Sequence, residues 1–464
     1  MKVFLVGIKG VAMSALAVIL FKMGYEVNGS DVKESFITDE ELKKCGIIPK
    51  VGFDPNDITS NLNLIIYSGA NKGKNNPQVI KALSLGIKTF TQTEYICQIM
   101  KDFDHSIAVT GSHGKTTTSS LLSYCLIQLG EKPSYMIGSS SFNNYSGGDF
   151  NGKKYFVFEA DEYAVDPPYD NTIKLELYKP DSAIITNIDF DHPDVYRDIE
   201  HVKQVFLRFI DNTGRIHICI DDANSQEVLK KIDKSKIKTF GFSKEADLQI
   251  TSFKIDYSGS KFNLLHKGID LEWFETKLYG EKNISNITGV VSLLLDLGFE
   301  LRRIKDVIKD FKGAKRRFEL IFKQGNTYLF DDYAHHPAEI EATIKAARSV
   351  FKNKRLVVIF QSHTYSRTQK FLKEFTQTLS LADLIYIMPI FSSARENEKE
   401  FNVTSQSIVD TARQNIQMKS LSNKDELLAE LKKNLKSGDV IFTMGAGYLN
   451  NYSTDIIEVI KNLN

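Results

Sequence analysis

The first hundred residues alternate short apolar runs with longer stretches whose apolar positions recur every three or four residues. A short apolar run predicts a strand, whereas the three-to-four spacing predicts a helix with one buried face. The expected strands are Lys2–Val6, Glu26–Ser30 and Leu64–Ser68, and the expected helices are Met13–Met23 and Val79–Leu85. This alternation favours a parallel sheet covered by helices.

The last third of the chain shows the same alternation. It predicts strands at Tyr328–Phe330, Arg355–Phe360, Leu384–Met388 and Val440–Met444, and helices at Ala338–Phe351, Gln369–Leu379, Ser405–Gln417 and Lys424–Leu435. Residues 246–280 instead contain shorter alternating segments separated by Gly259 and Gly268, which predict a small antiparallel β insertion before a helix at Ile287–Leu297. The chain therefore belongs to the α/β class, and its length favours about three domains.

The composition narrows the possible classes of protein. Of the 464 residues, 42% are apolar and 25% are charged, with a net charge of +1. Such a balance predicts neither a nucleic-acid-binding nor a membrane-binding surface. Four widely spaced cysteines without a CxxC pair indicate free thiols in a reducing compartment. Since no apolar run is long enough to span a membrane and no signal peptide is evident, we expect a cytoplasmic protein.

A glycine-bracketed turn links a β-branched segment to an amphipathic helix at residues 107–118, Ile-Ala-Val-Thr-Gly-Ser-His-Gly-Lys-Thr-Thr-Thr. Such a turn points backbone N–H groups at one spot, and the helix adds the positive end of its dipole. Lys115 would reach the β- and γ-phosphates of a nucleotide, and Thr116 would bind Mg²⁺. Val109 replaces the first glycine of the usual eight-residue loop. The strand directly before the turn nevertheless favours a phosphate loop over a chance turn with a solvated lysine.

Acidic clusters follow two other expected strands. Tyr155–Phe158 leads into Glu159-Ala-Asp-Glu, and Ala183–Thr186 leads into Asn187-Ile-Asp-Phe-Asp-His. Ligands gather at the carboxyl ends of parallel strands, and carboxylates beside phosphates suit Mg²⁺. One cluster alone would be explained as a helix cap or a solvated turn. Two clusters beside a phosphate loop favour a metal site.

The first turn of the chain, Val6-Gly-Ile-Lys-Gly-Val-Ala, is an incomplete dinucleotide-binding pattern. Lys9 and Ala12 occupy positions that the GxGxxG pattern gives to glycine, although the cation of Lys9 would suit a diphosphate. Asp31, after the second strand, would accept a hydrogen bond from a ribose hydroxyl. A nicotinamide dehydrogenase would leave the phosphate loop unexplained.

Polar side chains also follow two strands of the last third. Asp331-Asp-Tyr-Ala-His-His-Pro comes after one strand, and Gln361-Ser-His comes after another, with Tyr365 and Arg367 close behind. The segment Lys-Arg-Arg-Phe-Glu at 315–319 opens this region.

Six motifs in this order resemble those of the Mur ligases, the ATP-dependent amino-acid ligases of peptidoglycan precursor synthesis. They are Thr-Gly-Ser-His-Gly-Lys-Thr-Thr-Thr, Glu-Ala-Asp-Glu, Asn-x-x-x-Asp-His, Gly-x-x-Asn-x-x-Asn, Lys-Arg-Arg-Phe-Glu and Asp-Asp-Tyr-Ala-His-His-Pro, with Ala394-Arg395-Glu396 and Thr443–Gly447 as further matches. The resemblance implies a Rossmann-like UDP-sugar-binding domain over 1–102 and a P-loop-type ATPase over 103–313, whose mostly parallel sheet carries the small β insertion. A second Rossmann-like domain, 314–464, would close over ATP and the amino acid.

The resemblance also implies roles for individual residues. The nucleotide would be held by Gly111, Ser112, His113, Gly114, Lys115, Thr116, Thr117, Asn283, Asn286, Arg317 and Asp332, with Asp332 at the ribose. Mg²⁺ would be bound by Thr116, Glu159 and His192. The substrates would contact Gly7, Lys9, Gly10, Asp31, Ser68, Tyr333, His335 and Arg367. Catalysis would depend on Lys115, His192, Arg317, His335 and Arg367.

Different segments of the chain resemble two different kinds of Mur ligase. The segments Ser-His-Thr-Tyr-Ser-Arg-Thr and Met-Gly-Ala-Gly resemble members that join L-alanine to UDP-N-acetylmuramate, whereas Tyr163 and Asp189-Phe-Asp-His resemble those that attach a preformed tripeptide. L-Alanine is favoured, because the nucleophile is selected largely in the third domain. We therefore expect ATP, Mg²⁺, UDP-N-acetylmuramate and L-alanine as ligands of a monomer or weak homodimer without nucleic-acid or membrane partners.

The adjacent histidines of the third domain have different expected roles. With an ordinary pKa of about 6.5, His335 would accept a proton from the incoming ammonium group. His336, ahead of Pro337, is better explained as a capped loop residue. A regulator without ligase activity would be expected to have lost Lys115, Glu159 or His192, yet all three are present.

Overall fold

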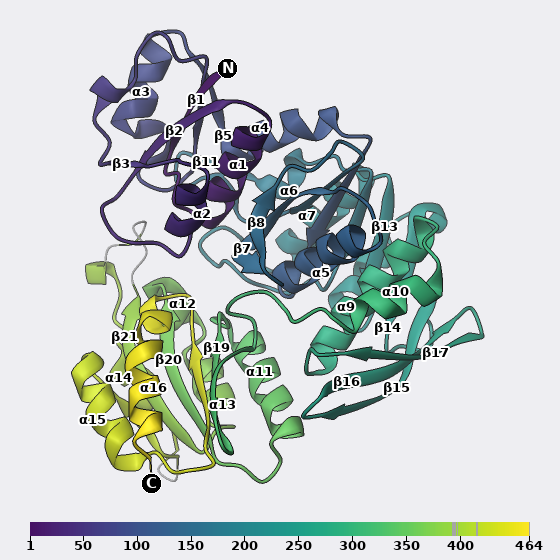
Figure 1. The fold of residues 1–464 in the computed structure, drawn as a ribbon, viewed down its shortest axis with the longest axis vertical. Coiled ribbons are helices and arrows are strands. Elements are labelled where there is room, and N and C mark those ends of the chain that lie inside the picture. Colours follow the sequence, from purple (N-terminus) through teal and green to yellow (C-terminus); the bar gives the residue numbers. More distant parts are fainter. Residues whose placement is uncertain (392–395, 397, 414–415, 464) are drawn as a thin grey trace.

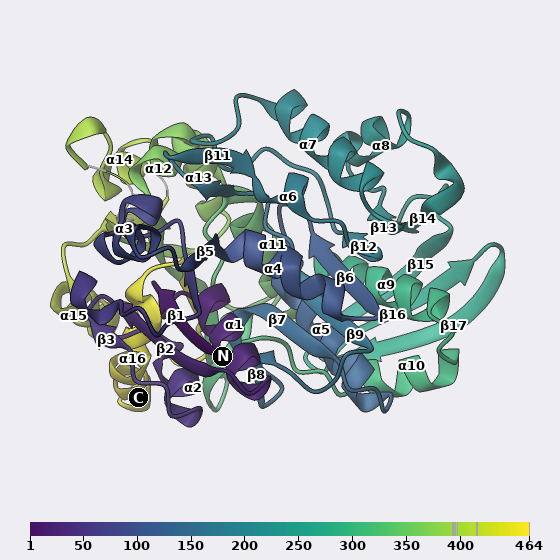
Figure 2. The same ribbon diagram turned by 90° about the horizontal axis from the view of Figure 1, so that it is seen from above.

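The computed structural model describes residues 1–391, 396, 398–413 and 416–463. The chain forms three α/β domains, of which the N-terminal one lies above the C-terminal one in Figure 1, with the central domain beside both. In Figure 2 the two outer domains lie on the same side of the central sheet. Within the described ranges, no helix is both long enough and apolar enough to cross a bilayer.

The N-terminal domain is a five-stranded parallel sheet in the order β3-β2-β1-β4-β5. Its strands are β1 (Lys2–Val6), β2 (Glu26–Asp31), β3 (Lys50–Val51), β4 (Leu64–Tyr67) and β5 (Lys88–Thr91). Its helices are α1 (Val11–Lys22), α2 (Asp39–Lys44), α3 (Pro77–Ser84) and α4 (Gln92–Ile99). The predicted alternation of strands and helices is confirmed.

The central domain contains a ten-stranded sheet in the order β17-β16-β15-β14-β13-β12-β6-β9-β7-β8. Its strands are β6 (His105–Thr110), β7 (Ser134–Phe142), β8 (Tyr145–Asp149), β9 (Tyr155–Glu159), β12 (Ser182–Ile185), β13 (Arg215–Cys219), β14 (Ile237–Gly241), β15 (Leu248–Asp256), β16 (Gly259–His266) and β17 (Ile269–Thr276). The helices are α5 (Lys115–Gln128), α6 (Lys174–Leu177), α7 (Ile199–Asp211), α8 (Ala223–Leu229), α9 (Glu281–Asp296) and α10 (Leu301–Ile308). A separate hairpin consists of β10 (Ala164–Asp166) and β11 (Asp170–Ile173).

The C-terminal domain has a six-stranded sheet in the order β18-β19-β23-β20-β21-β22, parallel except for the β18–β19 pair. Its strands are β18 (Glu319–Gln324), β19 (Thr327–Asp332), β20 (Leu356–His363), β21 (Leu384–Phe391), β22 (Met418–Ser420) and β23 (Val440–Met444). Its helices are α11 (Pro337–Val350), α12 (Tyr365–Lys370), α13 (Leu372–Leu379), α14 (Ser405–Asp410), α15 (Lys424–Asn434) and α16 (Ser453–Lys461).

The predicted antiparallel insertion is confirmed as β15–β17, and it extends the central sheet, because β15 pairs in parallel with β14. Two other local expectations are corrected by the structure. The helix predicted over Gln369–Leu379 is broken at Phe371, whose ring packs against His336 of another element. The helix predicted over Ser405–Gln417 ends at Asp410, because the chain must turn to bring β22 alongside β21.

The hydrophobic cores show how firmly the domains are joined. One continuous cluster contains residues of the N-terminal domain, such as Leu16 and Ile19, together with central residues such as Phe158 and Phe206. Both faces of the C-terminal sheet have clusters of their own. The N-terminal and central domains therefore share apolar packing, whereas the C-terminal domain is built around a separate core.

Helix α1 of the N-terminal domain packs directly on β7 and β8 of the central sheet. Gly148 of β8 allows this contact, because a Cβ at that position would lie 2.5 Å from both the Cα and the carbonyl oxygen of Ala15. The backbones of the two domains thus touch where a side chain would separate them.

We therefore expect Gly148→Ala to push α1 away from the sheet and to destabilise the protein by about 1–3 kcal/mol, the usual cost of overpacking. A thermal melt should show a lower melting temperature for the first transition. Ala12→Ser, at an exposed position of the same helix, is the control and should melt like the wild type. Equal melting temperatures for Gly148→Ala and the control would contradict the close approach.

Candidate active site

The phosphate loop joins the end of β6 to the start of α5. Gly111 has a φ of 125°, and a Cβ there would lie 2.2 Å from the hydroxyl of Thr186 and 2.8 Å from the carbonyl oxygen of Asn187. Only glycine meets both demands. Gly114 is the N-cap residue of α5, so the N–H groups of the first helical turn face the loop.

Asn187 and Asp189, after β12, hold the loop in this shape. The backbone N–H of His113 donates to Asn187 Oδ1 at 3.1 Å, and Asn187 Nδ2 donates to the carbonyl of His113 at 2.8 Å. Ser112 Oγ donates to the carbonyl oxygen of Asp189 at 2.9 Å. The predicted loop residues, Gly111, Ser112, His113, Gly114, Lys115, Thr116 and Thr117, thus form one rigid turn suited to a phosphate group.

Lys115 forms a buried ion pair that the sequence did not predict. Its Nζ donates to both carboxylate oxygens of Glu162, at 2.7 and 2.9 Å, and to the carbonyl of Gly111 at 2.8 Å. Burial lowers the pKa of Lys115, but Glu162 and Asp161 outweigh this effect and leave the pKa raised. The lysine is therefore a stable cation. Glu162 is part of the Glu-Ala-Asp-Glu motif, but the sequence around it does not indicate that it pairs with Lys115.

The predicted metal ligands form two neighbouring groups. Thr116 Oγ1 donates to Glu159 at 3.2 Å, whereas His192 Nε2 lies 3.7 Å from Glu162 Oε1. Ligand atoms of Asp161, Glu162 and His192 all lie within 4.8 Å of one another. Hydroxyl and carboxylate oxygens beside a phosphate loop fit Mg²⁺. The structure thus adds Asp161 and Glu162 to the candidate ligands.

Arg317 carries positive charge from the C-terminal domain to the phosphate loop. Its Nη2 donates to Thr116 Oγ1 at 3.2 Å, and its guanidinium lies 5.2 Å from the ring centre of Tyr333. The neighbouring Arg316 is turned into its own domain, where Nε pairs with Asp331 at 2.9 Å. The structure therefore brings Arg317, but not Arg316, to the predicted site.

Arg367 and His335 lie at the same boundary between domains. Arg367 Nη2 donates to Asp191 Oδ1 at 3.0 Å, and both side chains are buried. His335 Nδ1 lies 3.0 Å from the carbonyl of Tyr333. Burial lowers the pKa of His335 to about 4. The expectation of an ordinary pKa is therefore wrong, and His335 is a neutral and weak base at neutral pH.

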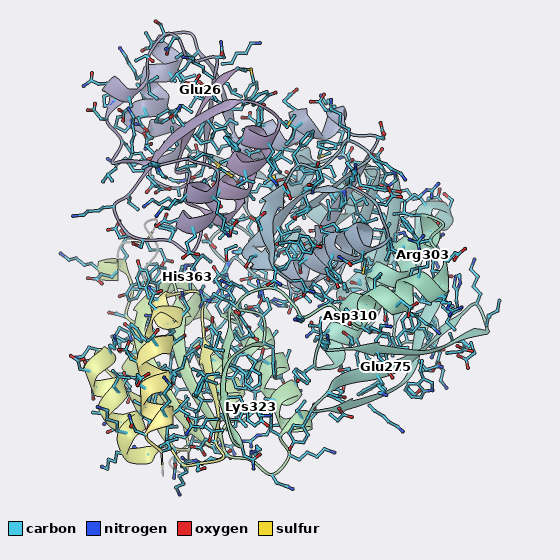
Figure 3. All side chains as sticks on the ribbon, viewed as in Figure 1. Glu26, Glu275, Arg303, Asp310, Lys323 and His363 are labelled. Carbon is cyan, nitrogen blue, oxygen red and sulfur yellow. The ribbon has the colours of Figure 1, made fainter. Side chains whose placement is uncertain are left out.

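Other polar groups follow the end of β20 and the start of α11. Figure 3 shows His363, the last residue of β20, at the edge of the C-terminal domain that faces the other domains, whereas Lys323 lies away from it. His336 Nδ1 accepts from the backbone N–H of Ala338 at 3.3 Å, so this residue itself caps the start of α11. Ala394 and Arg395 of the Ala-Arg-Glu motif lie outside the described residues.

A cavity of about 300 Å³ lies between the central and C-terminal domains. Its lining includes the polar or small residues His113, Gly114, Thr117, Asn283, Asn286, Arg317 and Asp332 and the apolar or aromatic residues Tyr279, Phe318, Ala342 and Ala346. Most of the predicted ATP contacts thus converge on one space.

The carboxylate of Asp332 already accepts from the N–H groups of Phe318 and Ala334 and from the Thr343 hydroxyl, and burial raises its pKa to about 6. A ribose hydroxyl would have to share this carboxylate with the three internal donors.

The first turn of the chain is built differently from the expectation. Lys9 Nζ donates to the carbonyls of Val32 and Glu34, at 3.1 and 2.9 Å, so its cation stabilises the loop after β2 and is not directed to a diphosphate. The carboxylate of Asp31 accepts from the N–H groups of Lys9 and Val32. It shapes the turn and is already occupied by backbone donors.

The remaining residues of the predicted UDP-sugar site do come together. A Cβ on Gly7 would lie 2.7 Å from Ser68 Oγ, so the ends of β1 and β4 meet there. Gly10 is the N-cap residue of α1 in the same turn. The candidate sugar-nucleotide contacts are thus the backbone groups of Gly7 and Gly10 and the hydroxyl of Ser68, at the carboxyl edge of the sheet, where ligands of such sheets bind.

A three-domain α/β architecture, with a phosphate loop at the central sheet and Arg317 supplied by the C-terminal domain, is typical of ATP-dependent ligases of the Mur type. Three family models match the chain: "Mur ligase family, catalytic domain" over residues 2–104, "Mur ligase middle domain" over 109–294, and "Mur ligase, glutamate ligase domain" over 316–447. The chain belongs to the Mur ligase family, the ATP-dependent ligases of peptidoglycan precursors.

Individual relatives are similar over nearly the whole chain. A UDP-N-acetylmuramate–L-alanine ligase of Lactobacillus acidophilus is 38% identical over 453 residues, which cover 97% of each chain. The crystal structure of a UDP-N-acetylmuramate–alanine ligase from Thermotoga maritima has a TM-score of 0.82 at 25% identity and covers 99% of both chains. A murein peptide ligase from Psychrobacter arcticus shares the fold, with a TM-score of 0.74 at 22% identity over 100% of this chain and 99% of that one.

His113 links the charge of the phosphate loop to solution pH. Its ring nitrogens lie 3.7 Å from Asp189 and 3.5 Å from Glu339. Burial lowers the pKa of His113, but the two carboxylates outweigh it and raise the pKa to about 9. A raised pKa in the folded state means that the stabilisation is complete below the unfolded value of about 6.5 and is lost as the pH rises toward 9.

The melting temperature of the wild type should therefore fall as the pH rises from 6.5 to 9, and His113→Asn should reduce this slope. Thermal melts at half-unit pH intervals measure it. His266→Asn, at a histidine whose pKa is lowered by burial, is the control and should keep the wild-type slope above pH 7. An unchanged slope in His113→Asn would show that His113 is not the titrating group.

Proposed function

We propose that the chain catalyses the ATP-dependent ligation of L-alanine to the lactyl carboxylate of UDP-N-acetylmuramate, giving ADP and phosphate. The observation that carries this proposal is the 38% identity with an L-alanine ligase over 97% of both chains. The geometry supports it, because Lys115 and Arg317 bring cations from two domains to the phosphate loop, and Arg367 adds a third cation at Asp191, beside the candidate metal ligand His192.

The chemistry requires activation of the acid before the amide forms. A carboxylate oxygen attacks the γ-phosphorus of ATP, the bond to the β-phosphate oxygen breaks, and ADP leaves. The amine nitrogen then attacks the acyl-phosphate carbon, loses a proton, and expels phosphate from the tetrahedral intermediate. Both steps bring anionic oxygens together, so charge neutralisation and positioning supply most of the acceleration.

The side chains of this site suit those two tasks. Lys115, at the start of α5, would leave Glu162 to contact the phosphates, and Arg317 would neutralise charge from the opposite side. Arg367 would exchange its contact with Asp191 for the substrate carboxylate. Neutral His335 is able to accept a hydrogen bond from the incoming amine. Its low pKa makes it a weak general base, which would not stay protonated at neutral pH.

Mg²⁺ fits the donor set on this side of the loop. Thr116, Glu159 and His192 would hold it, with Asp161 and Glu162 within reach of His192. When bound, the ion would neutralise phosphate charge.

A second candidate function is the attachment of a preformed tripeptide to the same carboxylate. It is favoured by Tyr163, which replaces the serine usual in L-alanine ligases and whose ring lies 4.8 Å from that of His192. The fold shared with a murein peptide ligase is compatible with it. The C-terminal motifs and the whole-chain likeness favour L-alanine.

The acceptor is tested by phosphate release from ATP and UDP-N-acetylmuramate with L-alanine, glycine, L-serine or the tripeptide. We expect L-alanine to give the highest kcat/KM. Preference for the tripeptide would replace the substrate but keep the chemistry, whereas no phosphate release with any acceptor would refute the ligase proposal for this chain.

Removal of the Lys115 charge should reduce kcat by roughly 10²- to 10³-fold, the typical loss of one positioned charge-stabilising group. Lys115→Met keeps the length and the helical propensity of the side chain, and the same phosphate-release assay measures its effect. Lys81→Met, at an exposed position of α3, is the matched control and should retain full activity. Wild-type kcat in Lys115→Met would remove the lysine from the mechanism.

A further inference from the structure

Glu339, in the first turn of α11, lies where the C-terminal domain meets the phosphate loop. Its Oε2 accepts from the backbone N–H groups of His335 and His336, at 3.0 and 3.2 Å, and lies 3.3 Å from His335 Nδ1. Its Oε1 lies 3.5 Å from His113 Nδ1 and 3.9 Å from Arg317 Nη1. Oε2 therefore contacts only groups of its own domain, whereas Oε1 lies between Arg317 of its own domain and His113 of the central domain.

The energetic consequence follows from burial. The side chain of Glu339 is 14% exposed, and a buried charge is unfavourable unless it is paired. Burial raises the pKa of Glu339, but His335, His113 and Arg317 outweigh it, and the pKa lies well below its usual range. His335 and Arg317 belong to the C-terminal domain, whereas His113 belongs to the central domain. The full set of partners exists only when the two domains are docked.

The same carboxylate also orients groups of the proposed mechanism. It fixes the backbone and the ring of His335, and it lies beside the guanidinium of Arg317, whose other nitrogen contacts Thr116. A separate ion pair, Arg367–Asp191, joins the domains without contacting Glu339 in the described structure. Loss of Glu339 should therefore misplace two reacting-site groups while one interdomain pair remains.

We propose that Glu339 is a positioning residue, which couples docking of the C-terminal domain on the phosphate loop to the placement of His335 and Arg317. This inference rests on the proposed ligase function for its kinetic part only, because docking of the domains is measurable without turnover. It assigns to Glu339 a role beyond that of a helix cap.

A single substitution separates the helix-capping role of Glu339 from its proposed role in docking the C-terminal domain. Glu339→Gln keeps the carbonyl oxygen that a capping box requires, since glutamine serves at this position. It removes the negative charge that faces His113 and Arg317. Glu341→Gln, on the same helix but partly exposed and paired only with Lys345 in the described structure, is the matched control.

The experiment combines steady-state kinetics with small-angle X-ray scattering of the full chain. We expect Glu339→Gln to lower kcat roughly 10- to 100-fold, the usual result of misplacing reacting groups, with the KM for the UDP-sugar within about twofold of wild type. Its radius of gyration in the presence of a non-hydrolysable ATP analogue should exceed that of the wild type. Glu341→Gln should match the wild type in both measurements.

A double-mutant cycle identifies the partner. His113→Asn should enlarge the radius of gyration as Glu339→Gln does, and the double variant should lose little more kcat than the more impaired single variant. Multiplicative losses, or a wild-type radius of gyration in both single variants, would overturn the inference. If the wild type released no phosphate, the ligase proposal would fail, and scattering of the same variants would still decide whether Glu339 couples the domains.

Discussion

The backbone of the phosphate loop is confined between the end of β12 and the start of α9, and the geometry of the site depends on this confinement. Gly111 presses against Thr186 and Asn187, while a Cβ on Gly114 would lie 2.7 Å from Asn286. The loop therefore has one conformation in which the charge of Lys115 and the hydroxyl of Thr116 both face the acidic strand ends. A looser loop would leave the same residues present but unable to act together.

The three domains are joined by different kinds of contact. Shared apolar packing fixes the N-terminal domain on the central one, because separating them would expose a continuous core. The C-terminal domain approaches the phosphate loop mainly through polar pairs, namely Arg317–Thr116, Arg367–Asp191 and Glu339–His113. Such pairs exchange for water or substrate at a modest net cost. At the phosphate loop, the C-terminal domain is thus held chiefly by polar contacts, although Ile255 and Tyr279 of the central domain also pack against its core.

The site is also balanced in charge before any substrate enters. Lys115 faces Glu162, and Arg367 faces Asp191. Each pair holds a cation in place without leaving it buried and unpaired, which would be strongly unfavourable. In the proposed reaction, phosphate and carboxylate groups of the substrates would compete with these internal carboxylates, so part of their binding energy would be used to rearrange the site. This competition favours ligands that supply several anionic oxygens in the correct arrangement.

The sequence by itself determined the α/β alternation, the phosphate loop, the acidic strand ends and the family, because each depends on residues that are close together in the chain. Local patterns also indicated that Arg317 and His336 would differ in role. They did not indicate that Glu162 pairs with Lys115, that Lys9 turns away from the expected ligand, or that Phe371 divides a helix.

Only the tertiary structure decided which charges meet across the domain boundary. Arg367 and Asp191 are 176 residues apart, and His113 and Glu339 come from different domains. A carboxylate in a short motif has many possible partners, and the choice among them depends on how helices and sheets pack. That packing also lowers the pKa of His335 and raises that of His113, because burial and the neighbouring charges exist only in the folded chain.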